Sequence, residues 1–390
     1  MHITKDIIYI GVNDYQLDFF EGQYIAPKGM AYNSYLIIDE KTAVIDSVDG
    51  NFTQQWLDNI AKALDGKVVD YLVVQHMEPD HSAGILDFVQ AYPHAKIVAS
   101  CKAFAMMKNF FCTDFAEKQV VVCEGGELSL GKHKLNFITA PMVHWPEVIM
   151  TYDSTDKVLF SADAFGKFGA FDADEGWTDE ARRYYIGIVS KYGSQVQAVL
   201  RKIAKMDIEK ICSLHGSVIG ENIPYYLERY NMWSGYQPEE DGVIIAYTSI
   251  YGNTKKAVLQ LAEELRVNGC PKVALIDIAR SDWSCAVAEA FRYDKLVLAT
   301  TTYNADIFPV MRQFIDHLVE RNFSNHTIAF VENGSWAPVA AKAMKAMIEK
   351  NRENTFAENS VKIVSALNEE STAQIKALAQ ELCADYEKRK

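Results

Sequence analysis

The hexapeptide HMEPDH, which begins at His76, places two imidazoles and two carboxylates within six positions. Imidazole and carboxylate groups are common protein ligands of zinc and non-haem iron, so this segment could hold metal ions. His76, Glu78 and Asp80 alternate along the chain and would share one side of an extended strand end. Pro79 would turn His81 away from them. Two ligand sets could then face two adjacent ions, but four side chains are too few for both.

Three further residues of metal-binding type follow apolar, strand-like runs. His144 stands in PMVHWPE, Asp163 in VLFSADAFG and His215 in ICSLHGSV. Strand ends are rigid positions from which side chains reach a shared site, so these three complete a plausible ligand set. An ordinary acidic turn at the hexapeptide is the weaker alternative. The remaining histidines lack such a context and are interpreted as structural: His2, His94, His133, His317 and His326.

The elements around these residues indicate a mixed α/β domain with much antiparallel strand. The run VVDYLVVQ before the hexapeptide predicts a buried strand, and AYNSYLIIDEKTAVIDS predicts two strands joined at DEK. TQQWLDNIAKAL predicts a helix, and more strands are expected around residues 120–160. We expect this first domain to span residues 1–236. The segment SGYQPEEDG, residues 234–242, predicts a linker because it is rich in Gly, Pro and acidic residues.

From residue 242 to 390 the pattern alternates strictly between strand and helix. Buried strands are expected at GVIIAYTS, KVALIDIA, KLVLATT, TIAFVEN and VKIVSAL, with amphipathic helices between them and at the end. Strands without polar alternation, each followed by a helix, predict a parallel sheet covered on both faces. The second domain should therefore be a doubly wound α/β sheet.

Three loops of this second domain predict a phosphate and ring-binding site. TSIYGNT follows the first strand and opens a helix, whose backbone N–H groups and hydroxyls could hold a phosphate. It has neither the P-loop Lys nor GxGxxG spacing, so a monophosphate cofactor is favoured, with an ordinary capped turn as the alternative. Ligands bind at the carboxyl ends of such strands, where Tyr303 and Trp336 could flank a flat ring. The residues expected to bind this cofactor are Thr248, Ser249, Ile250, Tyr251, Gly252, Asn253, Thr254, Thr301, Thr302, Tyr303, Asn304, Ala305, Asn333, Gly334, Ser335 and Trp336.

The composition of the chain argues against several classes of binding partner and metal site. The 390 residues carry a formal net charge of −13, which would repel nucleic acid. No uncharged apolar stretch approaches the length of a spanning helix, and the start MHITKDIIYIGVND does not resemble a signal peptide, so we expect a cytoplasmic protein without membrane partners. The seven cysteines include no C-x-x-C pair, which argues against a zinc ribbon or an iron–sulfur cluster.

Two family resemblances rest on these residues. H-x-E-x-D-H, followed by His144, Asp163 and His215, resembles the metal framework of the metallo-β-lactamase superfamily. Its zinc hydrolases have His where this chain has Glu78, and a carboxylate there shifts the site toward iron. Residues from 242 onward resemble flavodoxin, which implies FMN. The combination resembles the flavodiiron proteins, implying a metallo-β-lactamase-like αβ/βα sandwich followed by a flavodoxin-like doubly wound parallel sheet.

The flavodiiron resemblance also implies roles for the site residues. His76, Glu78 and His144 would bind one iron, Asp80, His81 and His215 the other, and Asp163 would bridge them. Glu78 and Asp163 are thus the expected catalytic residues of a centre that reduces O2 to water, or NO to N2O, with electrons relayed through FMN. The resemblance further implies a head-to-tail homodimer or a dimer of dimers, and a small electron donor such as rubredoxin or a flavin reductase.

Two other functions stay open on the sequence. A zinc-dependent hydrolase of the metallo-β-lactamase type could carry the flavodoxin-like domain as a passenger; Glu78 argues against it. A non-enzymatic electron carrier or gas sensor could bind metal without turnover; the nearly full ligand set argues against that. Neither O2 nor NO is selected by the ligands, because both gases would meet the same residues. Of the two, O2 is the preferred expectation.

Overall fold

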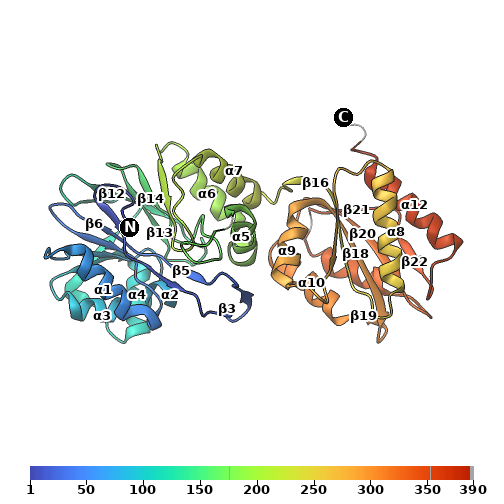
Figure 1. Ribbon diagram of the computed structural model, residues 1–390, viewed down its shortest axis with the longest axis horizontal. Coiled ribbons are helices and arrows are strands. Elements are labelled where there is room, and N and C mark those ends of the chain that lie inside the picture. Colours follow the sequence, from blue (N-terminus) through green and yellow to red (C-terminus); the bar gives the residue numbers. More distant parts are fainter. Residues whose placement is uncertain (175, 352, 387–390) are drawn as a thin grey trace. The chain divides into compact units, whose positions relative to one another are not determined.

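The computed structural model describes residues 1–174, 176–351 and 353–386. The chain divides into two compact units, Met1–Asn231 and Met232–Lys390. Figure 1 colours them from blue to green and from yellow to red. Each unit has its own sheets and its own hydrophobic core.

The N-terminal unit is built on two mixed sheets. The six-stranded sheet has the order β1 (Ile7–Tyr9), β6 (Tyr35–Ile37), β7 (Ala43–Ile45), β8 (Tyr71–Val73), β9 (Lys96–Ser100) and β10 (Gln119–Val122). The five-stranded sheet has the order β11 (Glu127–Ser129), β12 (Lys134–Thr139), β13 (Ile149–Asp153), β14 (Val158–Phe160) and β15 (Lys210–Cys212). Two short pairs stand apart: β2 (Val12–Asp14) with β5 (Met30–Tyr32), and β3 (Phe19–Phe20) with β4 (Tyr24–Ile25).

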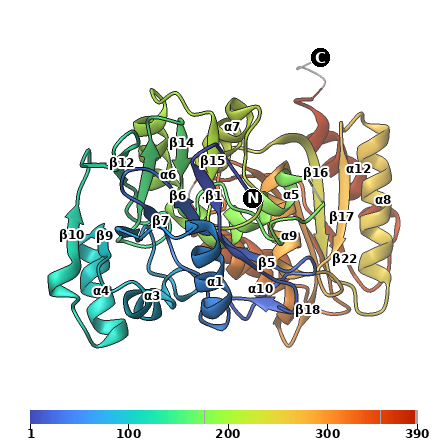
Figure 2. The ribbon, with the colours of Figure 1, turned by 60° about the vertical axis from the view of Figure 1, so that its left-hand side comes forward.

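The two large sheets share one apolar core. Tyr35 and Ile45 from the first sheet and Phe137 and Phe160 from the second are all buried in it. Helices lie on the outer sides (Figures 1 and 2), which gives an αβ/βα sandwich. The helices of this unit are α1 (Thr53–Leu64), α2 (Pro79–Ser82), α3 (Ile85–Ala91), α4 (Cys101–Phe111), α5 (Trp177–Tyr184), α6 (Gly193–Ile203) and α7 (Ile223–Ser234).

Helix α1 covers the segment TQQWLDNIAKAL, so the helix prediction there is confirmed. Trp56, Ile60 and Leu64 recur every four residues and are all buried, which forms the apolar face that holds the helix on its sheet. The Trp56 indole donates to the Ser34 hydroxyl at 2.9 Å, so its one polar atom is satisfied in the core. The helix ends at Asp65, whose left-handed φ of 48° closes the last turn.

The C-terminal unit is a parallel sheet with helices on both faces. Its strands follow the order β17 (Val273–Asp277), β16 (Glu240–Tyr247), β18 (Tyr293–Tyr303) and β20 (Thr327–Asn333), with β21 (Thr355–Phe356) and β22 (Val361–Ile363) both paired to β20. All these pairs are parallel, and β19 (Asp306–Ile307) folds back antiparallel on β18. The α/β fold class predicted for both halves, including the doubly wound second domain, is confirmed.

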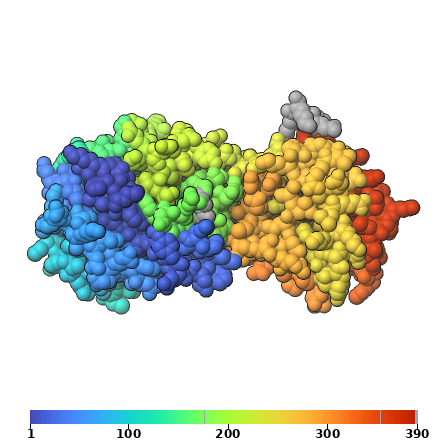
Figure 3. Space-filling model, viewed as in Figure 1, coloured from blue at the N-terminus to red at the C-terminus, as the bar shows by residue number. Residues whose placement is uncertain are grey.

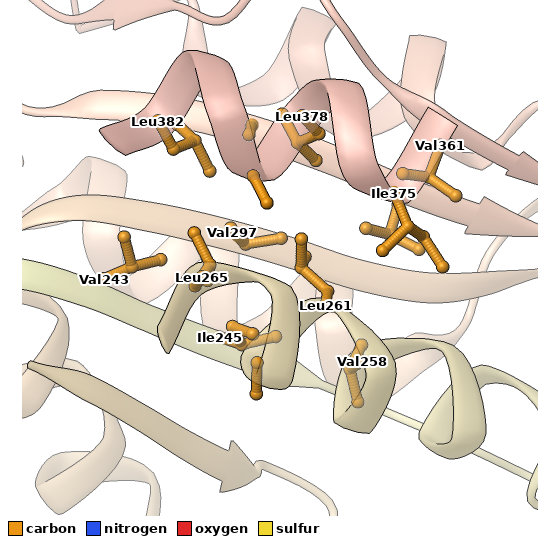
Figure 4. Close-up of a cluster of buried hydrophobic side chains, with 14 of the residues drawn as sticks. Val243, Ile245, Val258, Leu261, Leu265, Val297, Val361, Ile375, Leu378 and Leu382 are labelled. Atoms are coloured by element: carbon orange, nitrogen blue, oxygen red, sulfur yellow. The ribbon is translucent and has the colours of Figure 1, made fainter. Parts of the chain in front are cut away.

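Helices α8 (Asn253–Val267) and α12 (Glu369–Cys383) pack together on one face of this sheet. Figure 4 shows the contact: Leu261 and Leu265 of α8 meet Leu378 and Leu382 of α12 over strand residues such as Val297. The opposite face is covered by α9 (Trp283–Arg292), α10 (Pro309–Glu320) and α11 (Ala340–Ile348). Because both faces are covered, the central strands β16, β18 and β20 each contain a continuous buried apolar run rather than an alternating pattern.

The side chains fill the spaces that the ribbons leave within each unit (Figure 3).

Within the described part of the chain, none of the helices combines the length and apolar character that crossing a bilayer requires.

Candidate diiron and flavin sites

The four segments that carry the candidate metal ligands of the N-terminal unit each begin beyond the end of a strand. His76 follows β8, Asp163 follows β14 and His215 follows β15 by three residues each, and His144 lies in the loop between β12 and β13. These strands belong to both sheets of the sandwich. Their carboxyl ends, together with the β12–β13 loop, therefore bring four distant segments of the sequence to one place, as the strand-end argument predicts.

The second part of the hexapeptide is helical rather than extended. Helix α2 begins at Pro79, which is suited to a first helical position because it lacks an N–H. Asp80 and His81 thus occupy one helical turn and face the same group of residues, with Asp80 Oδ2 3.3 Å from His81 Nε2. The expectation that Asp80 lies on an extended strand and that His81 turns away is wrong, because Pro79 opens a helix here instead of kinking a strand.

His76, Glu78 and His144, which we call the His76 group, converge on one point. Glu78 Oε2 lies 3.3 Å from His76 Nε2 and 2.9 Å from His144 Nε2. The side chain of His76 is fully buried, and those of Glu78 and His144 are mostly buried. Two imidazole nitrogens and a carboxylate at these separations could serve one metal ion.

Asp80, His81 and His215, which we call the His215 group, converge on a second point. Asp80 Oδ2 lies 3.4 Å from His215 Nε2, and the Nε2 atoms of His81 and His215 are 3.0 Å apart. His215 Nδ1 lies 2.7 Å from the Ala31 carbonyl oxygen. Since a carbonyl can only accept, Nδ1 carries the hydrogen and donates it, and Nε2 is left as a ligand atom. All three residues are buried.

Asp163 stands between the two groups with one oxygen toward each. Its Oδ2 lies 3.1 Å from His76 Nε2 and 3.0 Å from His144 Nε2. Its Oδ1 lies 3.4 Å from His81 Nε2 and 3.7 Å from His215 Nε2. A carboxylate in this position can bridge two metal ions.

The chemistry of these residues fits two metal cations. Among the described residues, neither carboxylate oxygen of Asp80 or Asp163 has a hydrogen-bond partner, although both side chains are buried. Buried carboxylates without partners are costly unless a cation compensates them. Burial raises the pKa of Asp80 to about 7 despite the nearby His81. Burial also opposes ionisation of Asp163, but the facing imidazoles, led by His76, hold its pKa well below the usual range.

Two buried carboxylates outside the predicted set support the ligands. Asp46, which follows β7, accepts from the backbone N–H of Gln75 at 2.7 Å and from its side-chain amide at 2.8 Å, which fixes the residue before His76. Glu147 contacts His76 directly, with Oε1 2.8 Å from Nδ1. The sequence contained a signal for both: Asp46 ends the apolar run TAVID, and Glu147 lies in the same PMVHWPE segment as His144.

Among the described residues of the N-terminal unit, His133, Asp153 and Asp156 form one further histidine–carboxylate cluster. His133, which the sequence interpretation left as structural, has Nδ1 2.9 Å from Asp153 Oδ2, and both side chains are fully buried. Its Nε2 faces Asp6, which is also paired with Lys132 at 2.7 Å. Because Lys132 and His133 both contact the Asp6 carboxylate, we interpret the His133 cluster as a structural ion pair rather than a metal site.

In the C-terminal unit, the three predicted loops line one pocket of about 190 Å³. Its lining includes eleven of the expected cofactor residues: Ser249, Ile250, Tyr251, Asn253, Thr254, Thr301, Thr302, Asn333, Gly334, Ser335 and Trp336. Ser365, beyond the end of β22, also lines the pocket and was missed. The rule that located the other loops, a ligand at the carboxyl ends of parallel strands, would have located Ser365 as well.

The first loop has the form of an anion cradle. Gly252 precedes α8 with a φ of 91°, which favours glycine, and a Cβ there would meet no atom within 4 Å, so no neighbouring atom crowds this position. The Lys255 N–H donates to the Ser249 hydroxyl at 3.1 Å, and the N–H groups of Asn253 and Thr254 at the start of α8 are suited to a phosphate. Thr301 Oγ1 in the second loop is buried and has no partner among the described residues. These features fit a phosphate-bearing cofactor.

Five expected cofactor residues lie outside the lining. Thr248 is buried and its hydroxyl pairs with that of Thr300 at 2.6 Å, which ties β16 to β18. Gly252 acts through the loop's conformation. Asn304 and Ala305 form the left-handed turn between β18 and β19, and the Tyr303 ring packs edge-on against Phe308.

Comparisons with known proteins support a two-part chain with a lactamase-like unit followed by a flavodoxin-like unit. Residues 30–216 match the ODP family beta lactamase, and residues 244–375 match a flavodoxin domain. A nitric oxide reductase of Moorella thermoacetica is 31% identical over 91% of both chains. An anaerobic nitric oxide reductase flavorubredoxin of Vibrio vulnificus is 28% identical over 86% of this chain and 70% of its own.

Two solved structures share the whole architecture. Rubredoxin oxygen:oxidoreductase from Desulfovibrio gigas superposes with a TM-score of 0.91 at 26% identity, covering 100% of this chain and 99% of its own. The flavodiiron protein from Giardia intestinalis gives 0.89 at 25% identity over 98% and 95%. A lactamase-like metal unit followed by a flavodoxin unit defines an oxidoreductase class that couples a flavin to a metal pair. The chain belongs to the flavodiiron protein family.

Proposed function

We propose that this protein reduces O2 to water, or NO to N2O, at two irons held by the seven residues of the His76 group, the His215 group and Asp163. The position of Asp163, with one carboxylate oxygen facing each group, is the observation that carries the proposal. A mononuclear site would not need such a residue. We also propose that residues 1–236 carry the iron chemistry and residues 242–390 the FMN.

The chain's own residues would hold and orient the centre. The imidazoles and carboxylates supply nitrogen and oxygen donors suited to iron, and Glu78 provides an anionic donor where zinc hydrolases of this superfamily use His. The fold fixes these donors through buried strand ends, so little rearrangement is needed when gas binds. When bound, the irons would supply the site for the gas and the FMN would supply electrons received from a donor.

The flavin pocket would hold FMN by its phosphate and its ring. The loop that opens α8 would bind the phosphate through backbone N–H groups and the hydroxyls of Ser249 and Thr254. Trp336, which is 83% exposed, and Tyr251, which is 93% exposed, are large aromatic surfaces on which a flat ring would stack.

The decisive test is a parallel assay. The purified protein is quantified for iron, zinc and FMN, reduced under anaerobic conditions, and supplied with O2 or NO in separate reactions. We expect two irons and one FMN per chain and steady consumption of at least one gas, with O2 the favoured substrate. A reduced, fully loaded protein that consumes neither gas would overturn the proposal.

A zinc-dependent hydrolase is the alternative function. Its distinguishing outcomes are zinc in place of iron and turnover of an ester or thioester. The negative charge of Glu78, Asp80 and Asp163 disfavours the zinc hydrolase, because three carboxylates suit a harder and more highly charged metal than zinc.

We further propose a head-to-tail homodimer and a small electron donor such as rubredoxin. The need for a short path from flavin to iron supports the dimer proposal. Sedimentation combined with activity measured over a dilution series tests it. A monomer that keeps full specific activity at high dilution would contradict the dimer. Stopped-flow reduction of the FMN by rubredoxin or by a flavin reductase tests the donor.

A further inference from the structure

Glu147 is the most deeply buried carboxylate in contact with the candidate metal site that is not itself one of the seven ligands. It is 2% exposed and lies in the loop between β12 and β13, three residues after His144. Its Oε1 lies 2.8 Å from His76 Nδ1 and accepts from the Met77 backbone N–H at 2.8 Å. The same short loop therefore contributes one ligand and one supporting carboxylate to the His76 group.

The contact determines which nitrogen of His76 is free. A carboxylate only accepts hydrogen bonds, so His76 Nδ1 carries the hydrogen. Nε2 then presents its lone pair toward Glu78 and Asp163, which lie 3.3 and 3.1 Å away. A carboxylate behind a ligating imidazole also makes the ring a stronger donor.

The backbone around Glu147 is tied on both sides. Its carbonyl accepts from the Ser100 hydroxyl at 2.9 Å, at the start of α4. Two residues later, the Ile149 N–H donates to the Gln75 carbonyl at 3.1 Å, directly before His76. The carboxylate is thus held in register with the imidazole by the backbone and does not depend on a flexible side chain alone.

Among the described residues, no carboxylate forms a hydrogen bond with an imidazole Nδ1 of the His215 group. His215 Nδ1 donates to the neutral Ala31 carbonyl, and His81 Nδ1 has no partner among the described residues. Glu147 Oε2 is also buried and has no hydrogen-bond partner among the described residues. A buried carboxylate with spare negative charge is stabilised by a cation on the far side of the imidazole it contacts. The electrostatic difference therefore favours a cation in the His76 group.

We infer that Glu147 is a positioning residue for His76 and that it makes the His76 group the tighter and more electron-rich of two unequal metal positions. This inference rests on the proposed diiron function. The His76 position should fill first and empty last, and the metal in the His215 group should be the one that chelators remove first.

The test uses metal-free full-length protein titrated anaerobically with Co(II), followed by its visible absorption and by calorimetry. Wild-type protein should bind two equivalents in two resolved steps. Glu147→Gln keeps an oxygen that accepts from His76 and Met77 but removes the charge. It should weaken the first step by about 10- to 100-fold and leave the second nearly unchanged. In iron-loaded protein it should also raise the midpoint potential of one iron.

The matched control is Asp153→Asn, which removes the charge from the other fully buried histidine–carboxylate pair of the same unit, that of His133. It should lower thermal stability without changing either Co(II) step. Glu147→Gln protein that folds and binds the first equivalent as tightly as wild type would overturn the inference while leaving the diiron proposal intact. Wild-type protein that binds fewer than two equivalents would overturn both. Two equal wild-type steps would overturn the inequality alone.

Discussion

The candidate metal ligands and the lining of the candidate flavin pocket differ in how the fold holds them. His76, His81 and Asp163 are fully buried, and charged groups contact them from several strands. Tyr251 and Trp336 are 93% and 83% exposed on loops beyond the strand ends. The metal site is thus fixed by packing before any ligand binds, whereas the flavin pocket presents surfaces that a ligand would cover.

The difference has a physical origin in what each ligand needs. Two cations require anionic and imidazole donors at fixed short distances, and such donors are expensive to bury unless they are arranged together. A phosphate and a flat ring require backbone N–H groups, hydroxyls and aromatic faces, which ordinary loops provide. Single mutations should therefore reduce metal binding and gas turnover strongly in the N-terminal unit. Single mutations in the C-terminal unit should reduce FMN affinity only slightly.

Removing Asp163 should have the largest effect. Asp163→Ala deletes the carboxylate that faces both groups and leaves facing imidazoles without their compensating charge. Gas consumption should fall by more than about 100-fold and at least one iron should be lost, because removing even a residue that only supports a ligand costs 10- to 100-fold. FMN content should be unchanged. Metal analysis, flavin absorbance and oxygen-electrode or NO-electrode traces measure the three quantities. Normal gas turnover would remove Asp163 from the site.

Glu78→His should have the next largest effect. It restores the residue that zinc hydrolases of the superfamily carry and removes one negative charge from the His76 group. We expect iron retention and gas reduction to fall by about 10- to 100-fold, with a gain in zinc relative to iron when both are offered. Competitive metal loading followed by elemental analysis measures this. Unchanged iron content and gas turnover would remove Glu78 from the ligand set.

The sequence predicted the metal site more completely than the flavin pocket, for the same reason that separates the two regions. His, Glu and Asp residues near strand ends, in that order along the chain, pointed to the seven candidate ligands that the structure brings together. Loop residues such as Thr248 and Tyr303 resemble cofactor residues in type, but Thr248 instead ties two strands together. Ser365 was missed although it follows β22, where the strand-end rule places ligands, because its residue type alone is not distinctive.

The fold was predictable where periodicity was strong. The helix at α1 and the strand–helix alternation of the C-terminal unit followed from burial patterns. The short helix α2 did not, because four residues carry no periodicity and Pro79 fits both a kinked strand and a helix start. Glu147 lies in the same segment as His144, but its contact with His76 could be recognised only in the structure, since it joins residues 71 positions apart.

The pH dependence of stability should differ in sign between the two units. In the C-terminal unit, burial lowers the pKa of His326 to about 4 despite nearby backbone carbonyls. The unfolded chain takes up a proton near pH 6.5 and the folded one does not, so this unit should lose about 2 kcal/mol between pH 7 and pH 5. In the N-terminal unit, burial opposes protonation of His133, but Asp153 outweighs it and raises its pKa, so that pair stabilises at low pH and weakens as pH rises.

Hydrogen exchange followed by mass spectrometry resolves the two units in one experiment. After correction for intrinsic exchange, the protection of β20 peptides should fall from pH 7 to pH 5. His326→Leu should remove this pH dependence, even if it lowers the protection at every pH. Peptides of β13, next to His133, should not show the same fall. A β20 slope that persists in His326→Leu protein would assign the dependence to another group.

Trp336→Ala should have the smallest effect and tests the flavin side of the comparison. Loss of one stacking surface is worth about 0.5–1.5 kcal/mol, so FMN should bind up to about 10-fold more weakly, with a shifted flavin potential and normal iron content. Trp336→Phe should recover most of the affinity because it keeps an aromatic face. Tyr303→Ala is the matched control: Tyr303 is 43% exposed, packs on Phe308 and lies outside the pocket lining, so its loss should leave FMN affinity unchanged. If Tyr303→Ala weakened FMN as much as Trp336→Ala, the ring would lie over the β18–β19 turn, and the pocket would extend beyond the twelve lining residues.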